Sequence, residues 1–352
     1  MLQLPERYKS LGDVVLGGMG EVVFCQDTIL ERCVAIKVLQ GDIDQRRIFD
    51  ELSALMRVRS KHVVQVYDYL QFHGRGLGIV QEFVEGRDLL EVDFSGLTIY
   101  DYYKNIWQVA SGIADIHSVG VIHRDIKPNN IKVDPEGVLK IFDFGLARND
   151  CDASTMGFIG THGFAAPELY SATVDFTNAI DVYSFAATAL HMAIGGLPAQ
   201  MMKPYQVSGA VDYFCTTRFP IPAILAGLLN SCLHSDPAQR PSILMVRDEL
   251  QKHILHDAHQ ALVVYKGQAK YLGSGSRSIN LKVANIGDVD ICYDGLSFSV
   301  TRISGEVFIN NEAVNVGYVL PGSCVVALGG GWRKNVERTF VTFDLSHPEI
   351  VL

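Results

Sequence analysis

The sequence predicts an α+β protein that is followed by an all-β unit, because the local pattern changes twice along the chain. Before about residue 95, short β-branched runs surround one stretch of helical spacing. From about residue 98 to 256, helical spacing dominates. After about residue 260, short strand-like runs and hairpin turns return. The length of 352 residues is typical of two domains.

The first part is expected to be a β-sheet with one helix. Apolar residues recur at helical spacing over 42–58, after two aspartates that are suited to cap a helix. The runs with strand composition are 21–24, 33–36, 63–67 and 77–80.

The helical part contains two well-marked helices. Ile106, Val109, Ile113 and Ile116 follow a 3-4-3 spacing, and Gly120 is placed to end that helix. The stretch 179–195 is apolar nearly all round. It is short and interrupted by polar residues, so a buried core helix is favoured over a membrane span.

The last part, 261–352, is expected to be a small β-sandwich or barrel. Asp294-Gly295 and Asn310-Asn311 are typical hairpin turns, each between apolar runs. The runs 325–328 and 340–343 add two further strands. Regularly spaced short strands of this kind are typical of sandwiches and barrels.

Charge and composition exclude several classes of protein. Residues 1–260 hold 22 Lys and Arg against 31 Asp and Glu, whereas 261–352 hold eight of each. The net charge of −9 therefore belongs to the first part and disfavours a nucleic-acid binder. We find no apolar run of membrane-helix length and no apolar signal core at the start, so we expect a cytoplasmic protein. The seven cysteines are scattered without a C-x-x-C pair, which favours reduced thiols.

Two features near the start are compatible with nucleotide binding, but neither is specific. Gly17, Gly18 and Gly20 lie on an apparent turn, where glycines let backbone amides approach phosphates, although a plain hairpin turn is the default interpretation. Lys37 ends an apolar strand-like run, where its charge needs solvent or a partner. Glu51 lies on the next predicted helix, so an ion pair with Lys37 and two unrelated surface charges both fit the sequence.

The segment 121–133 carries the strongest chemical signal. It crowds a carboxylate, cations and an amide into a short loop that contains a proline. Asp143 follows a strand-like run 18 residues after Asp125. Two aspartates and an asparagine at strand ends can hold a hard cation or supply a base near a hydroxyl that is to be phosphorylated. The polar residues of the loop are His123, Arg124, Asp125, Lys127 and Asn130.

Taken in order, these motifs resemble the eukaryotic-like (Hanks-type) protein kinase family, and the glycine-loop wording is most similar to its bacterial members. The resemblance runs from about residue 8 to 256. It implies a bilobal kinase domain over 1–256, with a β-rich N-lobe at about 8–84 and a helical C-lobe at about 85–256. The matching motifs are Gly17-x-x-Gly20-x-Val22, Val34-Ala35-Ile36-Lys37, Glu51, His123-Arg124-Asp125, Asn130, Asp143-Phe144-Gly145, Ala166-Pro167-Glu168, Asp181 and Arg240.

The resemblance implies an ATP site. The glycine loop is expected to cover the phosphates, and Lys37 to bind the α- and β-phosphates, positioned by Glu51. Glu82 and Val84 are expected to offer backbone groups to adenine. Gln81 falls at the gatekeeper position, where an apolar residue is commoner. The implied ATP-binding residues are Gly17, Gly20, Val22, Ala35, Lys37, Glu51, Gln81, Glu82 and Val84.

The resemblance also implies the catalytic roles. Asp125 is expected to accept or orient the proton of the substrate hydroxyl, and Lys127 to neutralise the γ-phosphate. Asn130 and Asp143 are expected to hold Mg²⁺. Three scaffold residues are implied besides: Glu168, paired with Arg240, and Asp181, which braces the catalytic loop.

Protein Ser and Thr are the implied substrates. The wording Asp125-Ile126-Lys127-Pro128 resembles that of Ser/Thr-directed kinases, and Thr161 fits the same interpretation. Because Arg124 precedes Asp125, a phosphate on the activation segment is able to pair with Arg124 and order that segment. The candidate sites of autophosphorylation are Ser154, Thr155 and Thr161. The alternative is a segment that is ordered without phosphate.

Two departures from the family pattern concern nucleotide affinity. Val15 stands where the first loop glycine usually sits, and Lys132 where an apolar residue often lies under adenine. Neither removes a catalytic group. The competing interpretations are a pseudokinase scaffold that binds nucleotide and partners, a small-molecule kinase of the aminoglycoside type, and a binding protein whose tail carries the function. Glu168, Asp181 and Arg240 argue against the second, because they resemble the protein-substrate platform.

The tail is less informative. The run 307–329 is similar to the closing strands of forkhead-associated domains, which bind phosphothreonine peptides. The upstream Gly-Arg and Ser-x-x-His elements of that family are not clear, and Arg277 and Ser297 are poor substitutes. We therefore expect an accessory β unit that binds a phosphopeptide or a regulatory protein, and neither nucleic acid nor membrane.

Overall fold

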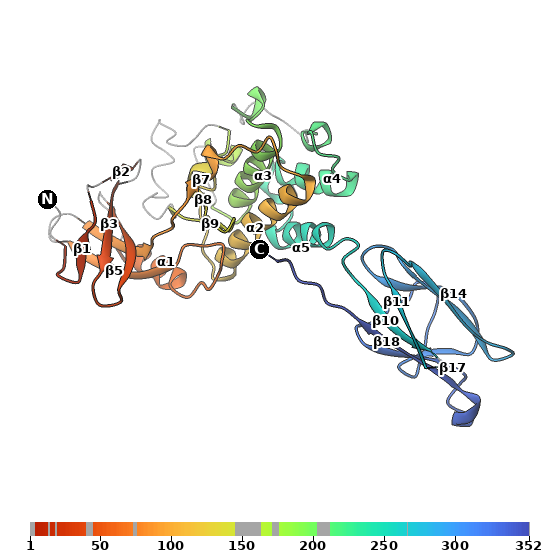
Figure 1. Cartoon of the computed structure of the whole chain (residues 1–352). Helices are drawn as coiled ribbons and strands as arrows, with labels where there is room; N and C mark the ends of the chain where they lie inside the picture. Colours follow the sequence, from red (N-terminus) through yellow and green to blue (C-terminus); the bar gives the residue numbers. More distant parts are fainter. Residues whose placement is uncertain are drawn as a thin grey trace. The chain divides into compact units, whose positions relative to one another are not determined.

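The computed structural model divides the chain into two compact units, Met1–Leu250 and Gln251–Val351, which are described separately (Figure 1). The structure describes residues 4–12, 15–17, 20–39, 45–72, 76–144, 163–170, 176–202, 212–265 and 267–351.

The first unit begins with an antiparallel sheet in the order β1-β3-β4-β6-β5, with β2 paired to β3. Its buried face includes Val23, Ile36 and Val80. The connection from β4 to β5 contains helix α1 (Gln45–Leu55), while the expected capping aspartates before it lie outside the described residues. The strands are β1 (Tyr8–Ser10), β2 (Val15–Gly17), β3 (Gly20–Asp27), β4 (Arg32–Leu39), β5 (Val66–Phe72) and β6 (Gly76–Glu82).

The strand expected at 63–67 is displaced, since β5 begins only at Val66. Val63 and Val64 are buried instead against the other half of the unit. The Val64 N–H donates to the Ile141 carbonyl, and the Ile141 N–H donates to the His62 carbonyl, at 2.9 Å each. The first residues of the apolar run therefore belong to a connection between the two halves. Their β-branched composition is the same as that of a strand, so the sequence does not distinguish the two.

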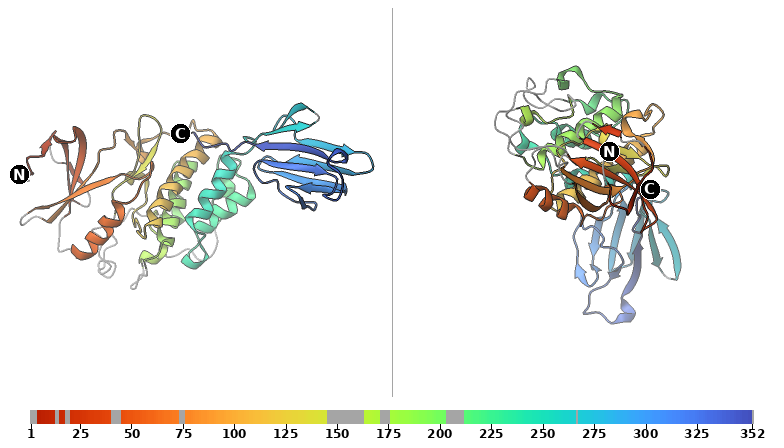
Figure 2. Two further views of the ribbon diagram at one scale, coloured as in Figure 1. Left: turned by 90° about the horizontal axis from the view of Figure 1, so that it is seen from below. Right: turned by 90° about the vertical axis from the view of Figure 1, so that its left-hand side faces the viewer.

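The second half of this unit is helical. Helix α2 begins with a capping box between Thr98 and Asp101 and ends before Gly120, whose φ of 77° is the left-handed conformation that favours glycine. Helix α3 is buried on nearly every side, as its composition predicts, and packs against α2 and α4 (Figure 2). Among the described helices, none is both long and apolar enough to cross a bilayer. The helices are α2 (Ile99–Ser118), α3 (Ala179–Ile194), α4 (Ala223–Cys232) and α5 (Ile243–Ile254).

A small three-stranded sheet and several single-turn 3-10 helices complete the first unit. In this sheet β8 pairs with β9. The loop that precedes β8, which contains Asp125 and Asn130, therefore lies near Asp143, which follows β9. Its strands are β7 (Arg87–Asp88), β8 (Ile131–Val133) and β9 (Leu139–Ile141). The 3-10 helices are Leu89–Glu91, Pro128–Asn130, Pro167–Tyr170, Ala199–Met202, Phe214–Thr216 and Pro237–Gln239.

The second unit consists of two antiparallel sheets that share one hydrophobic core, which includes Leu281, Ile291, Val326 and Phe343. One sheet has the order β11-β10-β18-β17-β15-β16 and the other β12-β13-β14. The strands are β10 (Ala261–Tyr265), β11 (Gln268–Leu272), β12 (Ser278–Val283), β13 (Gly287–Tyr293), β14 (Phe298–Gly305), β15 (Val307–Ile309), β16 (Glu312–Ala313), β17 (Cys324–Leu328) and β18 (Thr339–Leu345), and a 3-10 helix spans Asn335–Glu337.

Both predicted hairpins are present in this unit. Asp294 and Gly295 connect β13 to β14, and Asn310 and Asn311, with φ of 50° and 68°, connect β15 to β16. The predicted fold class, an α+β unit followed by a small all-β unit, is confirmed.

The two residues considered for phosphopeptide binding have structural partners in the second unit. The Arg277 guanidinium lies 2.7 Å from both carboxylate oxygens of Asp257. The Ser297 hydroxyl and N–H both donate to the Asp294 carboxylate and close the β13–β14 turn. The resemblance to forkhead-associated domains is not confirmed.

Candidate active site

The loop between α2 and β8 holds Asp125, Lys127 and Asn130 together. The Asn130 side-chain amide donates to the Asp125 carbonyl at 2.8 Å and to its Oδ2 at 2.9 Å. The Lys127 ammonium lies 3.0 Å from the same Oδ2. Asp125 and Asn130 are buried. One oxygen of the Asp125 carboxylate is thus held by an amide and a cation, which fixes the direction in which the group points.

Asp181, at the start of α3, is fully buried below this loop. Its carboxylate accepts hydrogen bonds at 2.8 Å from the N–H groups of His123 and Arg124 and lies 2.9 Å from the His117 ring. Burial alone raises the pKa of Asp181, but the contacts with His117 and His123 outweigh it and hold the pKa below its ordinary value. Arg124 has a φ of 65°, a strained conformation for a residue other than glycine, which these hydrogen bonds help to maintain.

Replacement of Asp181 with alanine is expected to lower the free energy of unfolding by about 3–5 kcal/mol, because two buried N–H groups lose their acceptor. Asparagine keeps one acceptor oxygen and should cost less. Since the folded pKa is depressed, the stabilisation exists above the ordinary pKa of about 4 and is lost as pH falls through the folded value. Urea unfolding between neutral and acidic pH checks this; a variant with the acid sensitivity of the parent would contradict it.

Asp143 follows β9 and contacts the Lys37 ammonium on β4. Lys37 is buried, and the Asp143 side chain is about one quarter exposed. Asp143 has a φ of 66°, the second non-glycine residue of the site in the left-handed region. Phe144 packs against His123 with ring centroids 5.0 Å apart. The two loops of the site and the N-terminal sheet therefore meet at one point.

Lys37 and Glu51, for which the sequence left open both an ion pair and two separate charges, contact different partners. Lys37 contacts Asp143, whereas Glu51 on α1 lies 3.4 Å from the Arg124 guanidinium. The Lys37 ammonium is therefore paired with the aspartate that follows β9. Arg124, which was expected to meet a phosphate of the activation segment, supplies the cation for Glu51.

The end of β6 joins the sheet to the strand β9 through the side chain of Glu82. Its carboxylate lies 2.5 Å from the Lys140 ammonium and accepts the Gln65 N–H at 3.1 Å. The Glu82 N–H donates to the Gln65 carbonyl at 2.9 Å. Gln81 is buried and is paired with Ala35 of β4, and Val84 lies half-buried beyond the strand. The side chain of Glu82 is thus structural, so any ligand contact has to use the backbone of this segment.

The glycine-rich turn is described only at its base. Gly17 of β2 pairs with Gly20 of β3, and Val22 on β3 lies opposite both Val15 and Lys37. The described base of the hairpin thus lies beside the strand that carries Lys37. The tip of the turn, Gly145 and the candidate phosphorylation sites Ser154, Thr155 and Thr161 lie outside the described residues.

Glu168 and Arg240 form a two-pronged ion pair with N–O distances of 2.7 and 2.8 Å. The buried guanidinium also donates to the carbonyls of His234 and Ala179 at 2.8 Å. Lys132, expected under adenine, lies 3.6 Å from Asp88 on the neighbouring strand, with its ammonium near the Phe142 ring. Its charge is therefore partnered beside the site.

Replacement of Arg240 with lysine is expected to lower the free energy of unfolding by about 2–4 kcal/mol, because an ammonium cannot reproduce the planar fork that reaches Glu168 and two carbonyls. Arg247→Lys on the exposed face of α5 is the matched control, since Arg247 pairs only with its neighbour Asp248 among the described residues. Equilibrium unfolding in urea measures both. Equal stability of the two variants would show that the Arg240 fork contributes nothing.

Several residues of the site were missed by the sequence interpretation. His117 on α2 contacts Asp181, and Lys140 on β9 pairs with Glu82 over a separation of 58 residues. His117 lies in the last turn of its helix, where a basic residue is common, so the sequence does not indicate its contact with Asp181. A lysine in the outward register of a short strand is usually solvated, so only the three-dimensional structure reveals the Lys140 pair.

The fold and this cluster define a member of a known family, and comparison with known proteins agrees. Residues 6–254 match the family model described as the protein kinase domain. The chain belongs to the protein kinase family.

Individual relatives are about one third identical to the chain over the residues that align. A probable serine/threonine-protein kinase of Clostridium acetobutylicum is 30% identical over 259 residues, which is 67% of this chain and 38% of that protein. A second, named pknA2, from Bifidobacterium longum is 32% identical over 211 residues, or 56% of this chain and 28% of that protein. Human cyclin-dependent kinase-like 2 is 33% identical over 276 residues, covering 67% of this chain and 56% of that protein. The chain thus matches only part of the length of each.

Proposed function

We propose that the chain is a serine/threonine protein kinase that transfers the γ-phosphate of ATP to protein hydroxyl groups. The observation that carries the proposal is the convergence of Asp125, Lys127 and Asn130 on one loop with Asp143 and Lys37 beside it, in a chain of the protein kinase family. In this assignment 1–256 is the kinase domain and 261–352 an accessory β unit. The scattered cysteines, without a C-x-x-C pair, are the basis for proposing a cytoplasmic location.

The catalytic loop is arranged for proton acceptance and charge stabilisation. Asn130 and Lys127 hold one oxygen of Asp125, so the carboxylate is oriented before a substrate hydroxyl arrives. As that hydroxyl attacks the γ-phosphorus, the bond from this phosphorus to the ADP oxygen breaks, ADP leaves, and Asp125 takes the hydroxyl proton. Lys127 lies 3.0 Å from Asp125, and in this proposal its charge offsets the negative charge of the transferred group.

The donor set fits Mg²⁺ and ATP. Asn130 uses its amide N–H to hold Asp125, which leaves its side-chain carbonyl oxygen as a ligand, and Asp143 adds a partly exposed carboxylate. Oxygen donors of this kind suit a hard cation, which neutralises phosphate charge when it is bound. Lys37 supplies a buried positive charge for the ATP phosphates. The adenine contacts come from the backbone at Glu82, through its carbonyl because its N–H is taken, and at Val84.

The choice of Ser and Thr over Tyr rests on Lys127 and on the similarity to the two bacterial proteins, which are named as probable serine/threonine-protein kinases. Protein substrates follow from the paired Glu168 and Arg240 and from Asp181, which support the segment around them. Autophosphorylation at Ser154, Thr155 or Thr161 is part of the proposal. A phosphate there would compete with Glu51 for Arg124, since the guanidinium already has that carboxylate as a partner.

The proposal is tested by incubating the full chain with ATP, Mg²⁺ and a general protein substrate such as casein, followed by mapping of phosphorylated residues by mass spectrometry. We expect phosphoserine and phosphothreonine on the substrate, and phosphate on the chain within 143–168. Phosphotyrosine alone would refute the assigned specificity. A chain that binds ATP without modifying any protein would instead support a nucleotide-binding scaffold.

A further inference from the structure

The outward face of the six-stranded sheet in the second unit is apolar. Inward residues of β10, β17 and β18 fill the core, so their neighbours in sequence point outwards. Along these described strands Asp344 is the one charged outward residue, whereas a sheet face in water is usually polar. The outward residues in this sheet are Ala269, Tyr271, Leu262, Val264, Phe340, Thr342, Asp344, Val325, Ala327, Phe308 and Ala313. We call this set the apolar face.

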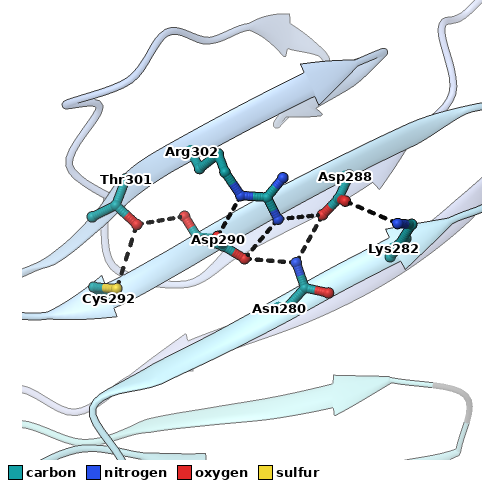
Figure 3. A network of polar contacts seen from close by, with 7 residues as sticks. All are labelled: Asn280, Lys282, Asp288, Asp290, Cys292, Thr301 and Arg302. Atoms are coloured by element: carbon teal, nitrogen blue, oxygen red, sulfur yellow. Dashed lines mark hydrogen bonds and ion pairs between the residues drawn. The ribbon is translucent and has the colours of Figure 1, made fainter.

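The other sheet of the same unit provides an internal comparison. Its outward side carries a continuous polar network in which Arg302 lies 2.6 Å from Asp290 and 2.9 Å from Asp288, with Asn280 bridging both aspartates (Figure 3). Lys282 lies 3.4 Å from Asp288. Two bases and two acids thus neutralise each other on a surface suited to water. The same unit therefore has one sheet with a polar outward side and one sheet with an apolar outward side.

Aromatic side chains continue the apolar face beyond its strands. Trp332 is 73% exposed and meets the ring of Phe308 edge-on, with centroids 5.8 Å apart. Tyr271 is 67% exposed at the opposite edge of the sheet, and Phe340 is 45% exposed between them. Exposed aromatic groups that span one sheet are typical of an interface core and are costly to leave in water.

The charges of the apolar face are self-complementary. The Arg338 guanidinium lies 4.8 Å above the Phe340 ring, just before β18, and Asp344 lies outward near the end of the same strand. If two copies pack these faces with their β18 strands antiparallel, Arg338 of each copy meets Asp344 of the other. Residues 261–352 hold eight bases and eight acids, so two such units do not repel as two of the acidic first units would.

We propose that the apolar face binds a second copy of this chain, in a two-fold symmetric, face-to-face packing of the two six-stranded sheets. A two-fold axis requires one patch to be complementary to itself, which the arrangement of Arg338, Phe340 and Asp344 provides. Sheets packed in this way interleave their outward side chains at an angle of about 30°. The assembly brings two kinase units into one particle. This proposal concerns the oligomeric state alone and does not depend on catalytic activity.

Sedimentation velocity of the full chain from nanomolar to high micromolar concentration tests the proposal. We expect a concentration-dependent dimer. Phe340→Glu should weaken it by roughly 30-fold or more, because a charge is buried at the centre of the interface. The matched control Ser278→Glu adds the same charge to the polar outward side of the other sheet and should leave the dimer unchanged. Both sites are exposed, so thermal melting is expected to match the parent.

A charge exchange tests the arrangement itself. Asp344→Arg places two cations together and should dissociate the dimer, and adding Arg338→Asp should restore it. A parent chain that stays monomeric at every concentration would overturn the proposal and point to a different protein as the occupant. A dimer that survives Phe340→Glu, or a double variant that melts like the parent but stays monomeric, would equally overturn it.

Discussion

Replacing Asp143 with asparagine is expected to reduce phosphoryl transfer by at least roughly 10³-fold, because the change removes both the proposed carboxylate ligand for Mg²⁺ and the acid that contacts Lys37. The fold should survive, since asparagine has the same size and tolerates the positive φ of this position. Steady-state transfer to casein measures the loss. Thermal shifts with ATP, with and without Mg²⁺, measure whether the metal-dependent part of binding is lost.

The matched control is Asp248→Asn, an exposed residue of α5 that should transfer phosphate at the parental rate. If Asp143→Asn kept both its rate and its Mg²⁺-dependent thermal shift, the placement of the metal and of the phosphates beside Lys37 would be wrong.

Replacing Asp125 with asparagine is expected to lower kcat by roughly 10²- to 10⁴-fold while the KM for ATP changes little. The reason is that Asp125 is proposed to act on the substrate hydroxyl and not on the nucleotide. Asparagine keeps one oxygen for Asn130 and Lys127, which both contact Oδ2 of Asp125, but it lacks the negative charge and the second oxygen that would take the proton.

Full kinetics with varied ATP separate the two parameters, and Glu136→Gln in an exposed turn is the control. A large rise in KM with kcat preserved would assign Asp125 to nucleotide binding and contradict its proposed role.

Much of the site was predictable because its chemistry is local in sequence. The loop with Asp125 and Asn130 is one short segment, and the spacing to Asp143 sets the β8–β9 hairpin that brings the two together. The family resemblance supplied their order and the protein kinase family is confirmed. Pairings between distant segments were harder to predict.

The Glu51 contact shows why. Sequence places Glu51 on a helix and Lys37 on a strand, but it does not decide which of two nearby cations the carboxylate meets, and the structure gives it Arg124. Val63 and Val64 likewise have strand composition. They contact β9 instead, where both side chains are buried.

The apolar face was invisible to sequence for a different reason. Strands such as β10 and β18 alternate between a core side and an outward side, and both sides carry apolar residues. Only the register between strands shows that Phe340, Val325 and Phe308 lie on one surface.

The measurement that tests the central claim most directly compares two labelled forms of ATP. The full chain is incubated with Mg²⁺ and casein in the presence of [γ-³²P]ATP or [α-³²P]ATP, beside the Asp125→Asn variant. The account predicts protein label from the γ-phosphate alone, on serine and threonine, with most of it lost in the variant. Label from the α-phosphate, or γ-label that does not depend on Asp125, would contradict the assignment of this site as a protein kinase centre.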